Sequence, residues 1–193
     1  AAPPEDIKIV KTIVDVELNT ENDTIEVMYR STVSNNGGQA AVYTVEDTLS
    51  VSDSLTVTSV VNNVEHEAGT EGDTDGDIGA PTAQQFNDGM VTLVEDETLQ
   101  PGKNEAWTFT LAFSLDADTI TVASADCVDD DDENGKTGFA NDVDVLVDNQ
   151  LVDEDDACDP IPLEPMIEIL KQINDGDDFV DADDANSAPI RKY

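Results

Sequence analysis

The stretch Glu105–Leu115 reads EAWTFTLAFSL, and its large apolar side chains fall on every second residue. These side chains belong to Trp107, Phe109, Leu111 and Phe113. Successive side chains of a β-strand point to opposite faces, so this alternation gathers the three rings and the leucine on one face. We therefore expect a strand with one face in the core of a β-sheet protein.

Similar runs rich in valine, isoleucine and threonine recur along the chain, which favours strands over helices. The other predicted strands are Ile7–Leu18, Thr24–Val33, Ala41–Val51, Leu55–Val64, Met90–Val94, Thr119–Ala125 and Phe139–Val147, with Gln150–Val152 as a further candidate. Turn signals such as Asn35–Gly38 and Pro101–Gly102 separate them. Glu65–Asp88 is polar and glycine-rich, so we expect a surface excursion there. The pattern predicts an all-β fold, an antiparallel sandwich of about seven to nine strands over residues 1–160.

The charge of the chain is strongly one-sided, with 45 acidic residues, 8 basic residues and a formal net charge of −37. Such a surface repels nucleic acid and anionic membranes, and no apolar run is long enough for insertion into a bilayer. Counter-ions must offset the self-repulsion, either from concentrated salt, as in a halophilic protein, or from millimolar calcium. An acidic surface that serves solubility alone is the remaining interpretation.

The sequence contains two cysteines, Cys127 and Cys158. In an acidic, strand-rich and exported chain we expect them to form a disulfide rather than a metal site, with two buried free thiols as the alternative. The segment Ala1–Pro4, AAPP, is typical of the small residues left after cleavage of a signal peptide. Both features predict an extracellular or cell-surface location.

A second copy of the first predicted strand stands near the C-terminus. Ile7–Asp15 reads IKIVKTIVD and Ile167–Asp175 reads IEILKQIND, with identical residues at every odd-numbered position. Both copies therefore present one largely apolar face that contains a single lysine. Between them, Asp159–Pro165 (DPIPLEP) predicts a stiff, extended linker. We interpret residues 161–193 as this linker, an exchanged or next-repeat strand and an acidic tail; coincidence between two β-prone segments is the alternative.

Several stretches share the motifs of one known group of repeats. They are Ile9–Thr12 (IVKT), Tyr29–Leu49 (YRSTVSNNGGQAAVYTVEDTL), Leu99–Thr110 (LQPGKNEAWTFT), Phe139–Val145 and Asp153–Pro162. In these the chain resembles the tandem immunoglobulin-like repeat family of bacterial and archaeal cell-surface proteins, a conserved domain of unknown function. The insertion Glu65–Asp88 departs from that pattern. The resemblance implies an immunoglobulin-like β-sandwich used outside the cell as a stalk, an adhesin segment or a fibre unit.

Clustered carboxylates make calcium the expected ligand. Asp130, Asp132 and Asn134 have the oxygen spacing that opens a calcium loop, with Gly135 at the sharp turn. Asn141 stands where an EF-hand would carry a glutamate, so we expect a strand-linking loop instead. The remaining candidates are Asp73, Asp75 and Asp77 in a second cluster, and Asp155, Asp177 and Asp181 on the two sides of the linker. A solvated acidic loop is the alternative for each cluster.

No catalytic residue is predicted. His66 is the one histidine and lies in a polar stretch, where a surface residue is expected. With both cysteines expected to be bonded, pairs of a nucleophile and a base are nearly excluded, so we do not expect an enzyme. Asn22 begins an Asn-Asp-Thr acceptor pattern for N-glycosylation, although Thr24 also fits the start of a strand.

The pattern as a whole favours a structural subunit of an extracellular, pilus-like filament built from copies of this chain. The segment Met166–Asn174 would add as a donor strand to a sheet of the next subunit, in an open head-to-tail polymer. The face offered to that sheet would hold Ile167, Ile169, Lys171 and Ile173. One alternative is a repeat module of a long surface adhesin or stalk, in which this segment begins the next domain. Another is an adhesin domain that binds a cell-surface or matrix ligand through residues 65–88.

Overall fold

The computed structural model describes residues 6–67, 75–127, 137–163, 172–174 and 179–181. The chain divides into two compact units, Ala1–Ile161 and Pro162–Tyr193. In the second unit, β10 (Gln172–Asn174) pairs in antiparallel fashion with β11 (Phe179–Asp181). All other described strands and helices belong to the first unit.

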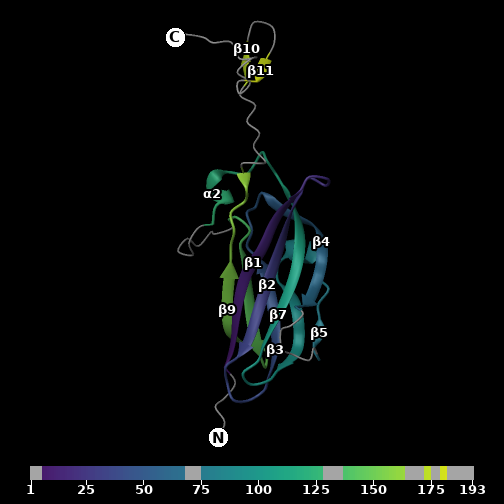
Figure 1. Cartoon of the computed structure of the whole chain (residues 1–193), viewed down its shortest axis with the longest axis vertical. Coiled ribbons are helices and arrows are strands. Elements are labelled where there is room, and N and C mark those ends of the chain that lie inside the picture. The colour runs from purple at the N-terminus through teal and green to yellow at the C-terminus, as the bar shows by residue number, and fades with distance from the viewer. Residues whose placement is uncertain (1–5, 68–74, 128–136, 164–171, 175–178, 182–193) are drawn as a thin grey trace. The chain divides into compact units, whose positions relative to one another are not determined.

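The first unit consists of two antiparallel sheets packed face to face (Figure 1). One sheet has the order β1-β2-β7-β4 and the other has the order β5-β6-β3-β8-β9. The strands are β1 (Ile7–Asn19), β2 (Thr24–Asn35), β3 (Ala41–Leu49), β4 (Leu55–His66), β5 (Asp77–Ile78), β6 (Val91–Leu99), β7 (Asn104–Leu115), β8 (Asn141–Val147) and β9 (Gln150–Ala157). These strands confirm the predicted all-β antiparallel sandwich.

The alternating stretch that predicted a core strand is β7, which lies between β2 and β4 in the first sheet. Its four large apolar side chains are at most 1% exposed. Phe109 stacks on Tyr29 of β2 with ring centroids 5.3 Å apart, and Phe113 meets Phe139 at 5.5 Å. The buried face of β7 therefore lies at the centre of the core, and aromatic side chains of other segments pack against it.

The predicted strand at Thr119–Ala125 is wrong, because the structure has a one-turn helix there, α2 (Val122–Ala125). Thr121 Oγ1 accepts a hydrogen bond of 3.1 Å from Ser124 N, and Ser124 Oγ accepts one of 3.0 Å from Thr121 N. These reciprocal bonds satisfy backbone groups locally, as in a capping box, and outweigh the β-propensity of the isoleucine, threonine and valine residues.

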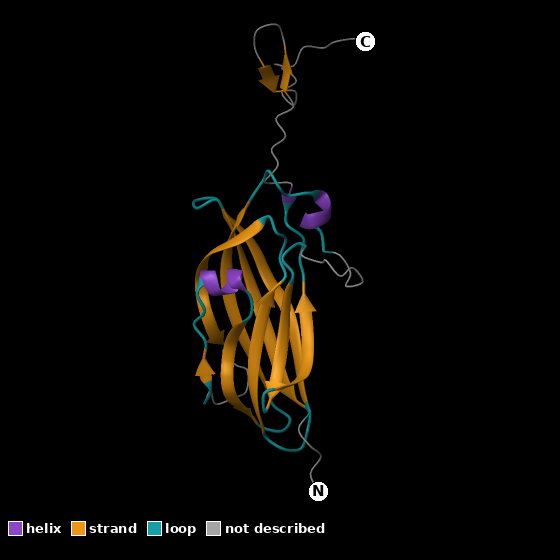
Figure 2. Ribbon diagram, turned by 180° about the vertical axis from the view of Figure 1, so that it is seen from behind, coloured by secondary structure: helices purple, strands orange, loops and turns teal. Residues whose placement is uncertain are grey.

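The described part of Glu65–Asp88 lies mostly at the surface, as expected, but it contains β5 and a helix that is anchored to the sandwich. The short helix α1 (Ala83–Asp88) packs against the edge of the first sheet (Figure 2), with Phe86 only 2% exposed. Phe86 stacks on Phe109 at 5.4 Å. Asn87 accepts a hydrogen bond from Val57 N and donates one to Val57 O, both of 2.9 Å. The side chain of Asn87 thereby covers the edge of β4 at Val57 as a neighbouring strand would.

At the opposite edge of the first sheet, β1 lies beside β9 of the second sheet (Figure 1). Ile9 N donates a hydrogen bond of 3.0 Å to Asp153 Oδ2, and Lys11 N donates one of 2.7 Å to Asp155 Oδ2. Lys8 adds an ion pair to Asp153 at 3.4 Å. Two aspartate side chains of β9 thus occupy the backbone donors of β1 at the β1–β9 junction.

Candidate functional site

Lys11 is the most unusual residue of the core. It shares the inward face of β1 with Ile7 and Ile9, and it is as buried as they are, with 3% of its surface exposed. Its partner across the β1–β2 ladder is Ser31, which is also fully buried. A lysine ammonium group is costly in such a place unless partners compensate for the lost water.

Those contacts come from both sheets. Lys11 Nζ donates hydrogen bonds to Ser31 Oγ at 3.3 Å and to Asp47 Oδ2. Asp47 belongs to β3 of the opposite sheet, and its other oxygen, Oδ1, accepts a bond of 2.7 Å from Nδ2 of Asn141 on β8. Asp47 pairs with Val143 in the β3–β8 ladder, so Asn141 lies diagonally beside it on the same face. One carboxyl group therefore holds the lysine amine on one oxygen and the asparagine amide on the other.

The amide of Asn141 is only half satisfied. Its oxygen, Oδ1, is buried and has no hydrogen-bond partner among the described residues. Aromatic rings line the site, with Lys11 Nζ 4.8 Å from the ring centroid of Phe109 and 5.4 Å from that of Tyr29. The cluster Lys11–Asp47–Asn141 is thus enclosed by apolar surface, and one of its polar atoms is unpaired.

Burial shifts the pKa values of Lys11 and Asp47. It lowers the pKa of Lys11, against the opposing attraction of Asp47. It raises the pKa of Asp47, against the charge of Lys11 and the hydrogen bonds from Lys11 and Asn141. Both directions favour the uncharged forms, because a low-dielectric interior disfavours charge. Burial therefore moves both groups toward their uncharged forms, while their mutual attraction opposes that shift.

A second polar cluster lies in the same core. Tyr43 Oη donates a hydrogen bond of 2.6 Å to Glu105 Oε2, and Trp107 Nε1 donates one of 2.9 Å to Tyr43 Oη. The other carboxylate oxygen, Glu105 Oε1, is buried and has no hydrogen-bond partner among the described residues. Burial raises the pKa of Glu105 to about 7, and the charges of nearby Glu97 and Asp75 act in the same direction.

The predicted disulfide is confirmed, because Cys127 and Cys158 are bonded. Cys127 lies just beyond α2, and Cys158 directly follows β9. Gly138 lies against the disulfide with φ of +49°, and a β-carbon there would come within 2.6 Å of Asp159 O. Near the disulfide, Phe139 N bonds to Asp159 O at 2.9 Å and Ile161 N bonds to Ala125 O at 2.8 Å. The chain is therefore held at several points where it leaves the sandwich.

The calcium candidates fall mainly outside the described residues. This applies to Asp73, Asp130, Asp132, Asn134 and Asp177. In the part of the chain that is described, no three or more His, Cys, Asp or Glu side chains gather closely enough to hold a metal ion. Asp75 Oδ1 accepts a hydrogen bond of 2.9 Å from Thr98 N, and Asp77 lies in β5. Asp155 receives the bond from Lys11 N at the β1–β9 junction.

The residues proposed for strand exchange and modification are placed as follows. Ile167, Ile169 and Lys171 lie outside the described residues, whereas Ile173 is in β10 opposite Val180. Asn22 is exposed in the turn between β1 and β2. His66 ends β4 rather than lying in a loop, and its ring meets that of Trp107 edge-on at 5.0 Å.

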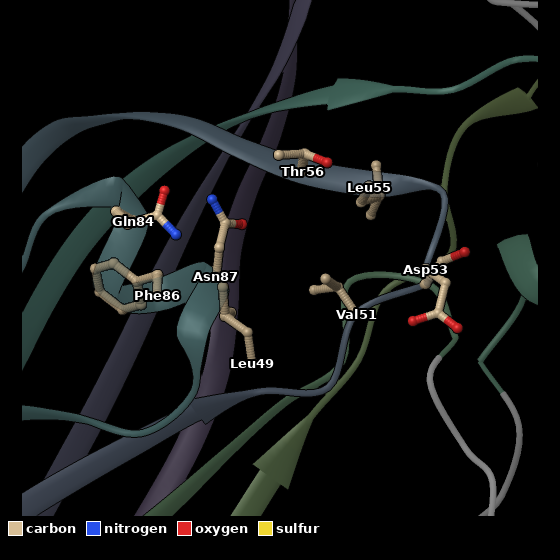
Figure 3. A pocket seen from close by; sticks show the side chains of 9 residues that line it. Leu49, Val51, Asp53, Leu55, Thr56, Gln84, Phe86 and Asn87 are labelled. Atoms are coloured by element: carbon tan, nitrogen blue, oxygen red, sulfur yellow. The ribbon is translucent and has the colours of Figure 1, made fainter.

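A surface pocket lies between the β3–β4 connection and α1 (Figure 3). Leu55, Phe86 and Asn87 contribute to its wall. Asp53 is the one ionisable side chain among the described residues that line it. The pocket therefore offers no pair of acid and base groups.

Sequence reasoning did not connect these three residues. The signal was present, because Lys11 stands alone among isoleucines on the inward face of β1 and Asp47 follows the alternating run of β3. Asn141 falls in the predicted strand Phe139–Val147 and at the last position of a candidate calcium loop, and neither placement indicates a contact with Lys11. Nothing in the order of the residues shows that β1 and β8 face one another across the core.

No protein-family model matches this sequence, and no curated protein matches it either. Among solved structures, the full-length major pilin SpaD of Corynebacterium diphtheriae is similar at a TM-score of 0.42 and 16% identity, covering 79% of this chain and 33% of that one. A GH20 exo-β-N-acetylglucosaminidase of Vibrio harveyi is similar at a TM-score of 0.31 and 13% identity, covering 80% of this chain and 18% of that one. The chain thus spans about a third or less of the length of these structures, and likeness of this degree carries no statement about function.

Proposed function

We propose that this chain is a structural module of an extracellular fibre or surface stalk, in which the sandwich transmits tension along the polymer. The observation that carries the proposal is the way the chain leaves the sandwich. The disulfide Cys127–Cys158, the bond from Phe139 N to Asp159 O and the buried Ile161 fix the first residues of the predicted linker Asp159–Pro165 to the sandwich. A pull on the linker would therefore reach a covalent anchor before it could peel β9 from the sheet.

The disulfide Cys127–Cys158 also supports an extracellular location. Disulfides persist in oxidising surroundings outside the cytosol and are rare within it. No helix in the described part of the chain is long and apolar enough to cross a membrane. The large negative charge keeps such a surface soluble and discourages binding to nucleic acid. We therefore place the module in the extracellular space or at the cell surface.

Assembly is proposed to occur by strand addition from residues 166–174 of one copy to a sheet of the next. The outer strands are β1 and β4 in one sheet and β5 and β9 in the other. β1 and β9 lie against each other through aspartates of β9, residues 75–79 bond to β6, and β4 is covered at Val57 by Asn87. The part of β4 from Ser59 to Val64 has no such cover among the described residues, and Val61 is 43% exposed. We propose that this edge receives the added strand.

The test is electron microscopy of the purified protein and of two variants. Deletion of residues 163–193 should leave a folded monomer that forms no fibres. Val61→Lys places a charge on the proposed edge and should also prevent fibres, whereas Val10→Lys, on the 53% exposed outer face of β1, should not. Fibres formed by the truncated chain would exclude the mechanism.

The alternative within the same class is a module of one long tandem-repeat surface protein, in which the link to the next sandwich is covalent. The immunoglobulin-like repeat resemblance favours this version. The intact mass of the mature protein distinguishes the two, because a discrete subunit would have a mass near 20.7 kDa.

We also propose that counter-ions, either calcium or concentrated salt, offset the negative charge of the acidic clusters. Calcium that binds only the folded chain should raise the melting temperature, and the rise should continue with the logarithm of the calcium concentration above the dissociation constant. Melting curves at constant ionic strength, with calcium and with magnesium, would separate a specific cation from general screening. No response to calcium beyond that to magnesium would remove calcium from the proposal.

A further inference from the structure

The hydrogen bonding of the cluster Lys11–Asp47–Asn141 is incomplete in a way that a purely structural role does not explain. A buried ion pair is usually stabilising only when the remaining hydrogen-bonding groups are satisfied. Here the amide of Asn141 is held through its nitrogen alone, and its oxygen is buried without a partner among the described residues. An unpaired buried polar atom in a native core calls for a specific explanation, of which a chemical role is one.

The side chains of Lys11, Asp47 and Asn141 provide the functional groups that an amide-exchange reaction needs. Lys11 supplies a primary amine, Asn141 supplies a carboxamide, and Asp47 contacts the amine through one oxygen and the amide nitrogen through the other. We propose that Lys11 Nζ and Asn141 Cγ form an intramolecular amide (isopeptide) bond, with Asp47 as the proton-transfer group and ammonia as the leaving group. The bond would join β1 of one sheet to β8 of the other.

The reaction balances without any further reactant. The lone pair of the Lys11 amine attacks Asn141 Cγ, and the electrons of the carbonyl bond move to Oδ1. Asp47 gives its proton to Nδ2 and takes one from the attacking nitrogen. The Cγ–Nδ2 bond then breaks, the carbonyl bond returns, and ammonia leaves. The products are one secondary amide, one ammonia molecule and Asp47 in its starting state.

The surroundings favour this step in three ways. Burial favours the neutral amine and the protonated carboxyl, which are the forms that the reaction needs. The rings of Tyr29 and Phe109 exclude water, which would otherwise compete for the amide. The fold holds the reactants on rigid strands, so the entropic cost of bringing them together is met by folding. The reaction therefore requires the folded chain and happens once per molecule.

The bond would have a mechanical consequence, which rests on the proposed function. Tension that enters at β1 would pass through Lys11 directly to Asn141, and from there along a short path to the disulfide at Cys158. Residues 12–126 would lie outside this covalent path. Most of the sandwich would then be protected from unfolding by force, whatever the strength of its hydrogen bonds.

Mass spectrometry of the reduced, purified protein tests the proposal. The wild type should be lighter than its sequence mass by one ammonia, and Lys11→Met and Asn141→Ala should each have the full sequence mass. Digestion after lysine and arginine should give residues 9–30, uncut at Lys11, joined to residues 137–171 in one branched peptide. A wild type of full sequence mass would overturn the proposal. An unbranched digest would also overturn it, even if the wild type had lost ammonia at another site such as Asn36–Gly37.

Two near-isosteric variants test the roles without emptying the core. Asp47→Asn keeps the shape but cannot exchange a proton, so it should stay at full mass; cross-linking at the wild-type rate would overturn the role of Asp47. Asn141→Asp should lose water instead of ammonia and reach the same branched product. These readouts do not depend on fibres: a cross-linked protein that forms no polymer would contradict only the proposed function.

Discussion

Asp47 on β3 accepts a hydrogen bond of 2.7 Å from Asn141 on the neighbouring strand β8, while its second oxygen accepts one from Lys11 in the opposite sheet. The side chains of Lys11 and Asp47 are both 0% exposed. One carboxyl group therefore organises the polar contacts between the two sheets. Its removal affects stability as well as the proposed chemistry.

Asp47→Ala should destabilise the sandwich by about 3–5 kcal/mol, because it leaves the amine of Lys11 buried without a counter-charge. Asp15→Ala is the matched control, since it removes one negative charge from an exposed residue of β1 and should change stability by less than about 0.5 kcal/mol. Urea unfolding of both variants at neutral pH measures the difference. Equal effects of the two substitutions would show that the buried pair contributes little.

Cys127→Ser combined with Cys158→Ser should lower the stability by about 3–4 kcal/mol, the loop-closure entropy expected for the 31-residue separation. The wild type should lose the same amount in the presence of a reductant. The double variant should be insensitive to that reductant, which serves as the internal control. Thermal melting with and without reductant measures both effects, and a wild type that melts unchanged after complete reduction would contradict the prediction.

The sandwich was predictable because its strands carry the period-two pattern that burial on one face imposes. Trp107, Phe109, Leu111 and Phe113 show this in the sequence and lie in the core in the structure. The strand predicted at Thr119–Ala125 failed because the reciprocal bonds of Thr121 and Ser124 decide that segment locally. Propensity describes average surroundings, and two side-chain bonds are enough to reverse it.

The candidate site was not predictable in the same way. Phe86 looked like an isolated ring in a polar stretch, and only the chain path shows that it stacks on Phe109. In the sequence, Lys11 is the one lysine of a largely apolar face, and Asn141 falls in the predicted strand Phe139–Val147. Their meeting at Asp47 depends on which strands face each other across the core, and pairings between sheets leave no fixed spacing in a sequence.

Phe86→Ala should cost about 3–5 kcal/mol, because it removes a fully packed ring from between α1 and Phe109 and leaves a cavity. Met90→Ala is the matched control: Met90 follows the same helix but is 59% exposed, so its truncation should cost little. Chemical unfolding monitored by the fluorescence of Trp107 measures both. A small effect of Phe86→Ala would show that the 75–88 region is not part of the cooperative core.

The raised pKa of Glu105 predicts how the stability of the folded protein changes with pH. Burial raises its pKa from 4.5 to about 7, assisted by the charges of Glu97 and Asp75 and opposed by the hydrogen bond from Tyr43. Between these two pH values the folded protein holds a proton that the unfolded chain has released. The stabilising contribution of this proton is therefore complete below pH 4.5 and is lost as the pH rises through about 7.

Glu105→Gln replaces the acid with a group that is neutral at every pH. The variant should become more stable relative to the wild type as the pH rises from about 4.5 to above 7, by up to about 3 kcal/mol over that range. Glu21→Gln, in the exposed turn after β1, is the control for the loss of one charge and should run parallel to the wild type. Urea unfolding across this pH range at high salt, which screens the net charge of −37, measures the three curves. If the Glu105→Gln curve also runs parallel to the wild type, Glu105 ionises equally in the folded and unfolded chain, and its unpaired oxygen carries no penalty.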